Sequence, residues 1–128
     1  MDNLGLVPKW QVKRLESVYN QGSLMDIAEL TQAMHEFVSS QGWYAPESKR
    51  PQTLRNLAIS LSLEASEVLE HFQWDENLSS TPALADELAD VALYLLQIAS
   101  LSGIDMEKAI LNKLEKNYTR NWENDRAS

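Results

Sequence analysis

The chain contains no cysteine. This absence excludes disulfide bonds and thiolate metal sites, and it fits a cytoplasmic location because structural disulfides form mainly in oxidising compartments. No apolar run reaches the roughly 18 residues that a membrane-spanning helix needs. The first residues, 1–14, lack the charged start and the apolar stretch of a secretory signal. Together these absences predict a cytoplasmic protein that is not held in a membrane.

Positive charge is also scarce. The 128 residues include 11 lysines and arginines against 19 aspartates and glutamates, which gives a formal net charge of -8 at pH 7. A general nucleic-acid binder presents a basic face, so this class is disfavoured. An acidic chain can still bind a phosphate ester if metal ions lie between the two. The charge therefore leaves two classes open, an acidic interaction module and an enzyme that uses carboxylate-bound metal.

Strand-like alternation is missing as well. Apolar residues recur instead at intervals of three and four, which is typical of helices, and 44% apolar content in a chain of this length indicates one globular domain. Ser23, Thr81 and Asp105 stand at positions suited to N-caps. The sequence thus predicts an all-α fold. Its five expected helices lie at about residues 8–21, 23–42, 52–73, 81–102 and 105–122.

Two of these helices have more apolar surface than one small core can cover. The helix at 52–73 has a continuous apolar stripe, and Ile59 and Leu63 lie well outside that stripe. The helix at 81–102 is apolar on nearly all sides, which predicts that it is buried. Exposed apolar area of this extent marks an interface, so we expect a homo-oligomer, either a dimer or a dimer of dimers.

The same two helices each carry a pair of acidic residues with the spacing i, i+3. Glu64 and Glu67 project from one face of the first helix, and Glu87 and Asp90 project from one face of the second. Burying such acids without positive partners is costly. Four carboxylates from facing helices form an all-oxygen site that suits Mg²⁺, with Mn²⁺ as the other candidate. The alternative is that these acids are surface charges or ion-pair partners.

The two acidic pairs resemble the signature of the all-α nucleoside triphosphate pyrophosphohydrolases, the MazG-like superfamily, and within it the dCTP pyrophosphatase branch and the single-domain MazG proteins. The likeness extends to residues 69–74, 91–95 and 113–121. It implies a MazG-like helical bundle with a four-helix core over residues 23–128, and it leaves residues 1–22 as an N-terminal extension helix. The implied reaction splits a nucleoside triphosphate into its monophosphate and pyrophosphate. Implied substrates are deoxynucleotides such as dCTP or dATP, in a house-cleaning or pool-balancing role.

The resemblance also implies roles for particular residues. The acidic set that binds Mg²⁺ and carries catalysis consists of Glu64, Glu67, Glu87 and Asp90. The set that contacts substrate consists of Trp43, Trp74 and Tyr94 around the base and of Lys113, Asn117 and Arg120 near the phosphates or the sugar. For the two tryptophans, stacking on a base competes with a structural role as a lid over the core. The likeness departs at Met34, where the dCTP pyrophosphatase branch has a histidine, and His35 stands one position later.

Two other functions compete with the enzyme. A non-enzymatic acidic helical interaction protein would account for the charge and the apolar faces, but not for acids on a buried helix. A di-iron carboxylate bundle needs Glu-x-x-His on two helices, and neither His35 nor His71 follows a glutamate by three residues. His71 shares the face of Glu67, and we expect it to be an exposed histidine at a helix end rather than a partner of the acids. The enzyme therefore remains the principal hypothesis.

Overall fold

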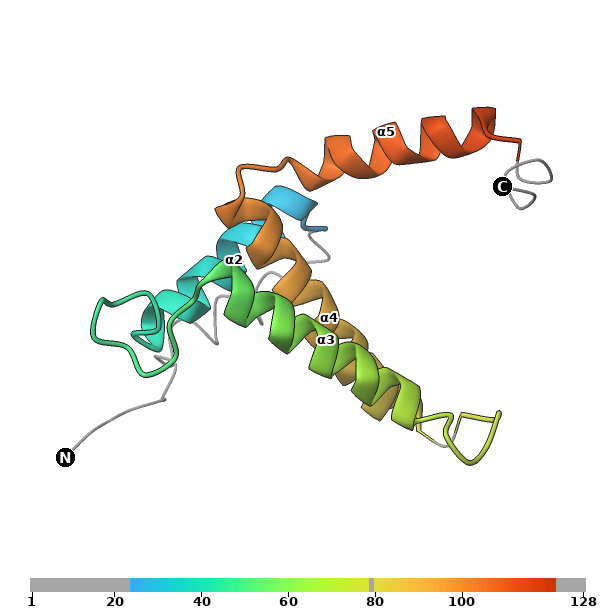
Figure 1. Ribbon diagram of the computed structural model, residues 1–128, viewed down its shortest axis with the longest axis horizontal. Helices are drawn as coiled ribbons and strands as arrows, with labels where there is room; N and C mark the ends of the chain where they lie inside the picture. The colour runs from blue at the N-terminus through green and yellow to red at the C-terminus, as the bar shows by residue number, and fades with distance from the viewer. Residues whose placement is uncertain (1–23, 79, 122–128) are drawn as a thin grey trace.

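The computed structural model describes residues 24–78 and 80–121, and their fold is all-α (Figure 1). The helices in this part of the chain are α2 (Ile27–Ser40), α3 (Leu54–Glu70), α4 (Thr81–Leu101) and α5 (Met106–Thr119). No strand occurs within the described residues. The prediction of the fold class is confirmed for this part. The expected first helix, at 8–21, lies outside the described residues, and so does Ser23.

Polar side chains cap all four helices at their N-termini. Each cap accepts a hydrogen bond from the backbone N–H three residues on. The four caps are Asp26, Thr53, Ser80 and Asp105. The predicted cap at Asp105 is confirmed. The predicted cap at Thr81 is wrong, because Ser80 has the extended backbone and the short polar side chain that capping requires. The cap of α2 is Asp26, and the predicted cap at Ser23 lies outside the described residues.

α3 and α4 form an antiparallel hairpin, and α2 packs against α4 (Figure 1). The buried apolar side chains are Met34, Val38, Leu57 and Ala99. They come from α2, the first turn of α3 and the last turns of α4, so the core lies where the three helices meet. Beyond that point the hairpin is two helices thick. Two helices leave their outer faces to water, so among the described residues α4 is covered mainly where it faces α3 and α2.

α5 does not join this packing. The chain bends by 102° between α4 and α5, and α5 runs away from the hairpin (Figure 1). Its apolar side chains Ile110, Leu111 and Leu114 are exposed. The described residues of one chain therefore do not form the four-helix core that the resemblance implied.

The uneven packing also corrects the prediction that the helix at 81–102 is buried. Leu88, Leu93 and Leu95 of α4 are exposed in the single chain. Among the described residues, no single helix has the length and apolar content to cross a membrane, and α4 and α5 meet that test only as a bent pair, by length and composition.

Candidate metal centre

The antiparallel hairpin brings the two acidic pairs together. Glu64 lies on α3, and Glu87 and Asp90 lie one turn apart on α4. One carboxylate oxygen from each of these three residues lies within 4.8 Å of the other two. The first two side chains are half-buried, and that of Asp90 is exposed. The cluster is thus open to water on the side of Asp90 and enclosed at Glu64.

Glu67, the fourth predicted ligand, lies beside this cluster. Its carboxylate is within hydrogen-bonding reach of the carboxylates of Glu64 and Glu87. It is more exposed than either of them, and its oxygens fall outside the closest set of three. The structure therefore brings together all four acids, with three of them arranged around one point and Glu67 next to it.

The cluster holds more negative charge than its surroundings offset. Burial raises the pKa of Glu64 to about 7, and the hydrogen bond with Glu67 and the charges of Glu67, Asp90 and Glu87 act in the same direction. Its Oε2 is enclosed and has no hydrogen-bond partner among the described residues. Buried carboxylate oxygens normally have a partner. A divalent cation would be a positively charged partner for these carboxylate oxygens, so the cluster is suited to hold such a cation.

His71 is the neighbouring group that opposes the negative charge. Its Nε2 lies 3.9 Å from Oε1 of Glu87, and its side chain is only 15% exposed. The hydrogen bond with Glu67 and burial raise the pKa of Glu87, while the charge of His71 lowers it. The expectation of an exposed histidine was wrong, because α3 ends at Glu70 and the following turn places His71 against the neighbouring helix.

The predicted base-binding aromatic residues are not gathered at one place in a single chain. Tyr94 lies one turn beyond Asp90 on α4 and is half-buried. Trp43 and Trp74 lie in the loops before and after α3, whose 17 residues span about 25 Å. Trp74 is 90% exposed. One chain therefore does not enclose a base between the two tryptophans.

Trp43 has structural contacts of its own. Its ring packs edge-on against Phe37, with 5.7 Å between ring centroids. The guanidinium of Arg50 lies over the ring at 5.4 Å from its centroid. This pairing is a cation–π contact, and it presents a flat, positively charged group at the surface of the loop at 41–53.

The predicted phosphate or sugar contacts lie on or just after α5. Lys113 and Asn117 are on α5, and Arg120 follows its last residue. The packing of the described residues joins α3 to α4 and α2 to α4, whereas α5 turns away. A single chain therefore does not bring these three residues to the acids.

A polar network that sequence reasoning missed lies at the other end of α4. The amide of Gln97, which is only 3% exposed, donates to Oη of Tyr44 at 3.2 Å and to Oε1 of Gln52 at 2.8 Å. The ring of His35 lies between Tyr44 and Ser100, with 2.6 Å to each hydroxyl oxygen. The signal in the sequence was a lone glutamine among the apolar residues of α4.

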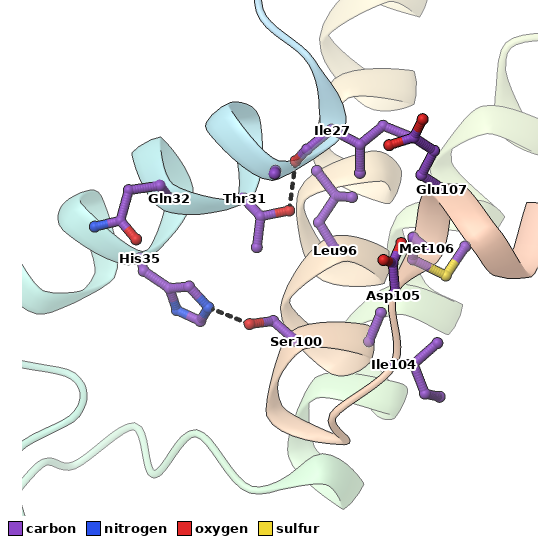
Figure 2. A pocket seen from close by; sticks show the side chains of 12 residues that line it. Ile27, Thr31, Gln32, His35, Leu96, Ser100, Ile104, Asp105, Met106 and Glu107 are labelled. Carbon is purple, nitrogen blue, oxygen red and sulfur yellow. Dashed lines mark hydrogen bonds between the residues drawn. The ribbon is translucent and has the colours of Figure 1, made fainter.

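Next to His35, a pocket of about 280 Å³ lies between α2, α4 and the start of α5. Figure 2 shows the hydrogen bond between His35 and Ser100 among the residues that line it, with Asp105 and Glu107 at the start of α5. The residues that line it are apolar, neutral or acidic. This pocket is therefore unsuited to a free phosphate group, and its lining is separate from the acidic cluster.

Comparison with known proteins agrees with this geometry. The MazG-like family matches residues 59–127, which is more than half of the chain. Over 94 residues the chain is 31% identical to dCTP pyrophosphatase 1 of Rattus norvegicus and 32% identical to that of Homo sapiens. These matches cover 66% of this chain and 52% of each relative, so the chain spans about half the length of these proteins.

A phage protein is similar as well. The chain is 30% identical over 105 residues to the dATP/dGTP diphosphohydrolase of Salmonella phage PMBT28, and the match covers 82% of this chain and 30% of that protein. The family match, over residues 59–127, includes both acidic pairs.

The raised pKa of Glu64 predicts how stability depends on pH without metal. The folded protein binds the proton of the Glu64 carboxyl more tightly than the unfolded chain does. The stability that this proton contributes is therefore fully present below pH 4.5 and is lost as pH rises through about 7. Glu64→Gln should therefore become increasingly stable relative to the wild type over this range. Urea unfolding in EDTA at several pH values measures the difference. The control is Glu70→Gln, an exposed position on the same helix, and a constant difference for Glu64→Gln would contradict the assignment.

Proposed function

This chain belongs to the MazG-like family, and from that premise we propose that it is a Mg²⁺-dependent nucleoside triphosphate pyrophosphohydrolase. The observation that carries the proposal is the cluster of Glu64, Glu87 and Asp90, whose oxygens lie within 4.8 Å of one another. Hard oxygen ligands of this kind suit Mg²⁺, with Mn²⁺ as a substitute. The names of the relatives, a dCTP pyrophosphatase and a dATP/dGTP diphosphohydrolase, support the same chemistry.

The acidic residues have two different roles in the proposed reaction. Glu64, Glu87 and Asp90 would hold the metal, and bound Mg²⁺ would offset the charge of the triphosphate and make a water molecule more acidic. Glu67 is more exposed than its neighbours and outside the closest set, so it is available to accept a proton from that water. The water oxygen bonds to one phosphorus of the α–β anhydride and the P–O–P bond breaks. The products are the nucleoside monophosphate and pyrophosphate.

A metal requirement also follows from the charge of the protein. With a net charge of -8, the chain would repel a triphosphate unless cations lay between them. The favoured substrates are deoxynucleoside triphosphates such as dCTP or dATP, and the role is the removal of surplus or unwanted nucleotides in the cytoplasm. A panel of deoxy- and ribonucleoside triphosphates, scored for monophosphate and pyrophosphate, tests this proposal.

Replacing any one acid by its amide should nearly abolish turnover. The four changes are Glu64→Gln, Glu67→Gln, Glu87→Gln and Asp90→Asn. Each removes a negative charge that binds metal or accepts a proton, and we expect losses of about 100-fold or more, as for other general bases and metal ligands. Pyrophosphate release with Mg²⁺ and the preferred triphosphate measures the effect.

The matched control for these variants is Asp86→Asn. Asp86 lies beside Glu87 on α4 and is exposed, so this change removes the same charge without touching the cluster, and activity should be retained. Without metal, the four amide variants should be as stable as the wild type or more so, since like-charge repulsion is relieved. Full activity in two or more of them would refute the assignment of the site.

We also propose that the active protein is a homo-oligomer, a dimer or a dimer of dimers, with no nucleic acid or membrane as a partner. Ile59 and Leu63 of α3 are 48% and 61% exposed in the single chain, and the apolar face of α5 is uncovered. Full burial of such a side chain contributes about 1.5–3 kcal/mol. A symmetric dimer would cover these faces, and α5 of a second copy would be able to bring Lys113, Asn117 and Arg120 to the acids.

A charge in this interface should break the assembly. We expect Leu63→Glu to dissociate or unfold the protein and to abolish activity, because an ionised carboxylate is costly to bury. Leu24→Glu is the matched control, since Leu24 is 95% exposed and lies before α2. Sedimentation velocity at micromolar concentration distinguishes the states. A wild-type protein that is a stable and active monomer of 14.5 kDa would overturn the proposal.

A further inference from the structure

Gln97 is the buried polar residue of the described core. The polar atoms of its side chain cannot remain unpaired at 3% exposure without a cost in stability. The two hydrogens of its amide nitrogen are directed to Tyr44 and Gln52. These two residues stand near the beginning and near the end of the loop at 41–53. One amide group of α4 therefore holds both ends of this loop.

Two of the hydrogen bonds have a fixed direction, and the two that involve the ring of His35 depend on its tautomer. An amide N–H can only donate, so Oη of Tyr44 accepts from Gln97. In the Nε2–H tautomer of a neutral His35, the hydroxyl of Tyr44 donates to Nδ1 and Nε2 donates to Oγ of Ser100, so that every donor has an acceptor. Burial lowers the pKa of His35, which favours this neutral form. The hydroxyl of Tyr44 is therefore held by two residues, His35 of α2 and Gln97 of α4.

The residue next to Tyr44 in the chain is Trp43. With Tyr44 tied to α4 and α2, the ring of Trp43 stands against Phe37 and under the guanidinium of Arg50. We use the term Trp43–Arg50 platform for this pair. Gln97 also shares a face of α4 with Asp90 and is seven residues beyond it, a distance of about 10 Å along the helix. A rigid helix thus sets the position of the platform relative to the acids.

We propose that Gln97 and Tyr44, supported by His35, are positioning residues that hold the Trp43–Arg50 platform where it receives the base of the nucleotide. This inference rests on the proposed function. Aromatic rings and guanidinium groups are the side chains on which bases stack. The network itself does not contact the acids in this arrangement, so it should affect how the nucleoside part binds and leave the metal site unchanged.

Two variants test the inference, Tyr44→Phe and Gln97→Met. The first removes one hydroxyl from a side chain that is 37% exposed, and the second keeps the length of a buried side chain while removing its amide. Gln32→Met is the matched control, because Gln32 is an exposed glutamine of α2 outside the network. Circular dichroism and sedimentation select the variants that remain folded and assembled as the wild type is.

Calorimetry with three probes separates the platform from the metal site. The probes are Mn²⁺ alone, inorganic pyrophosphate with Mg²⁺, and the α,β-imido analogues of dCTP and dATP with Mg²⁺. Both variants should bind the better analogue about tenfold more weakly, in the range for loss of one stacking contact, and should bind Mn²⁺ and pyrophosphate within about twofold of the wild type. In turnover, KM should rise by the same factor while kcat is retained.

Three results would overturn the inference. If folded variants bind the analogues as tightly as the wild type does, the network does not position a binding surface. If affinity for Mn²⁺ and pyrophosphate falls in parallel with affinity for the analogues, the network only supports the fold. If the wild type binds Mn²⁺ and pyrophosphate but neither analogue, the platform does not receive a base, while the metal site still stands. If the wild type binds none of the three probes, the proposed function itself fails.

Discussion

Four carboxylates on two antiparallel helices repel one another unless positive charge lies among them. The hairpin of α3 and α4 holds Glu64, Glu87 and Asp90 around one point, and the pKa of Glu64 is raised to about 7 as a result of burial and of this crowding. A fold that needed only stability would not gather these groups, since apolar residues would pack there without this repulsion. The arrangement is understandable if a divalent cation completes it, and the proposed hydrolysis of phosphoanhydrides uses that cation.

The same hairpin explains why the rest of the molecule looks incomplete as a single chain. Two packed helices cover each other on one face only, and α2 covers α4 over part of its length. The outer face of α3 and the apolar face of α5 are left to water. A second copy supplies the missing cover in the proposed assembly. The acidic cluster would then obtain its phosphate contacts from a helix that, within one chain, turns away from it.

Local pattern was enough to predict the presence of helices α2 to α5 and of the acidic pairs. The apolar spacing defines α3 and α4, and the i, i+3 spacing fixes Glu64 with Glu67, and Glu87 with Asp90, on single faces. Helix starts were misplaced where two capping residues compete, as at Ser80 and Thr81. The direction of α5 could not be predicted, because apolar periodicity identifies the apolar face of a helix but not the surface that this face packs against. The link of His35 to Ser100 joins residues 65 positions apart, and nothing local encodes such a contact.

The central claim is that the acidic cluster is a metal site, and anomalous diffraction tests it most directly. Crystals grown without metal and soaked in Mn²⁺ should give an anomalous difference peak about 2.0–2.3 Å from oxygens of Glu64, Glu87 and Asp90, the usual range for small divalent cations with carboxylate ligands. The same soak should give no such peak in crystals of Glu87→Gln. Well-ordered wild-type carboxylates at saturating Mn²⁺ with no peak between them would contradict the account.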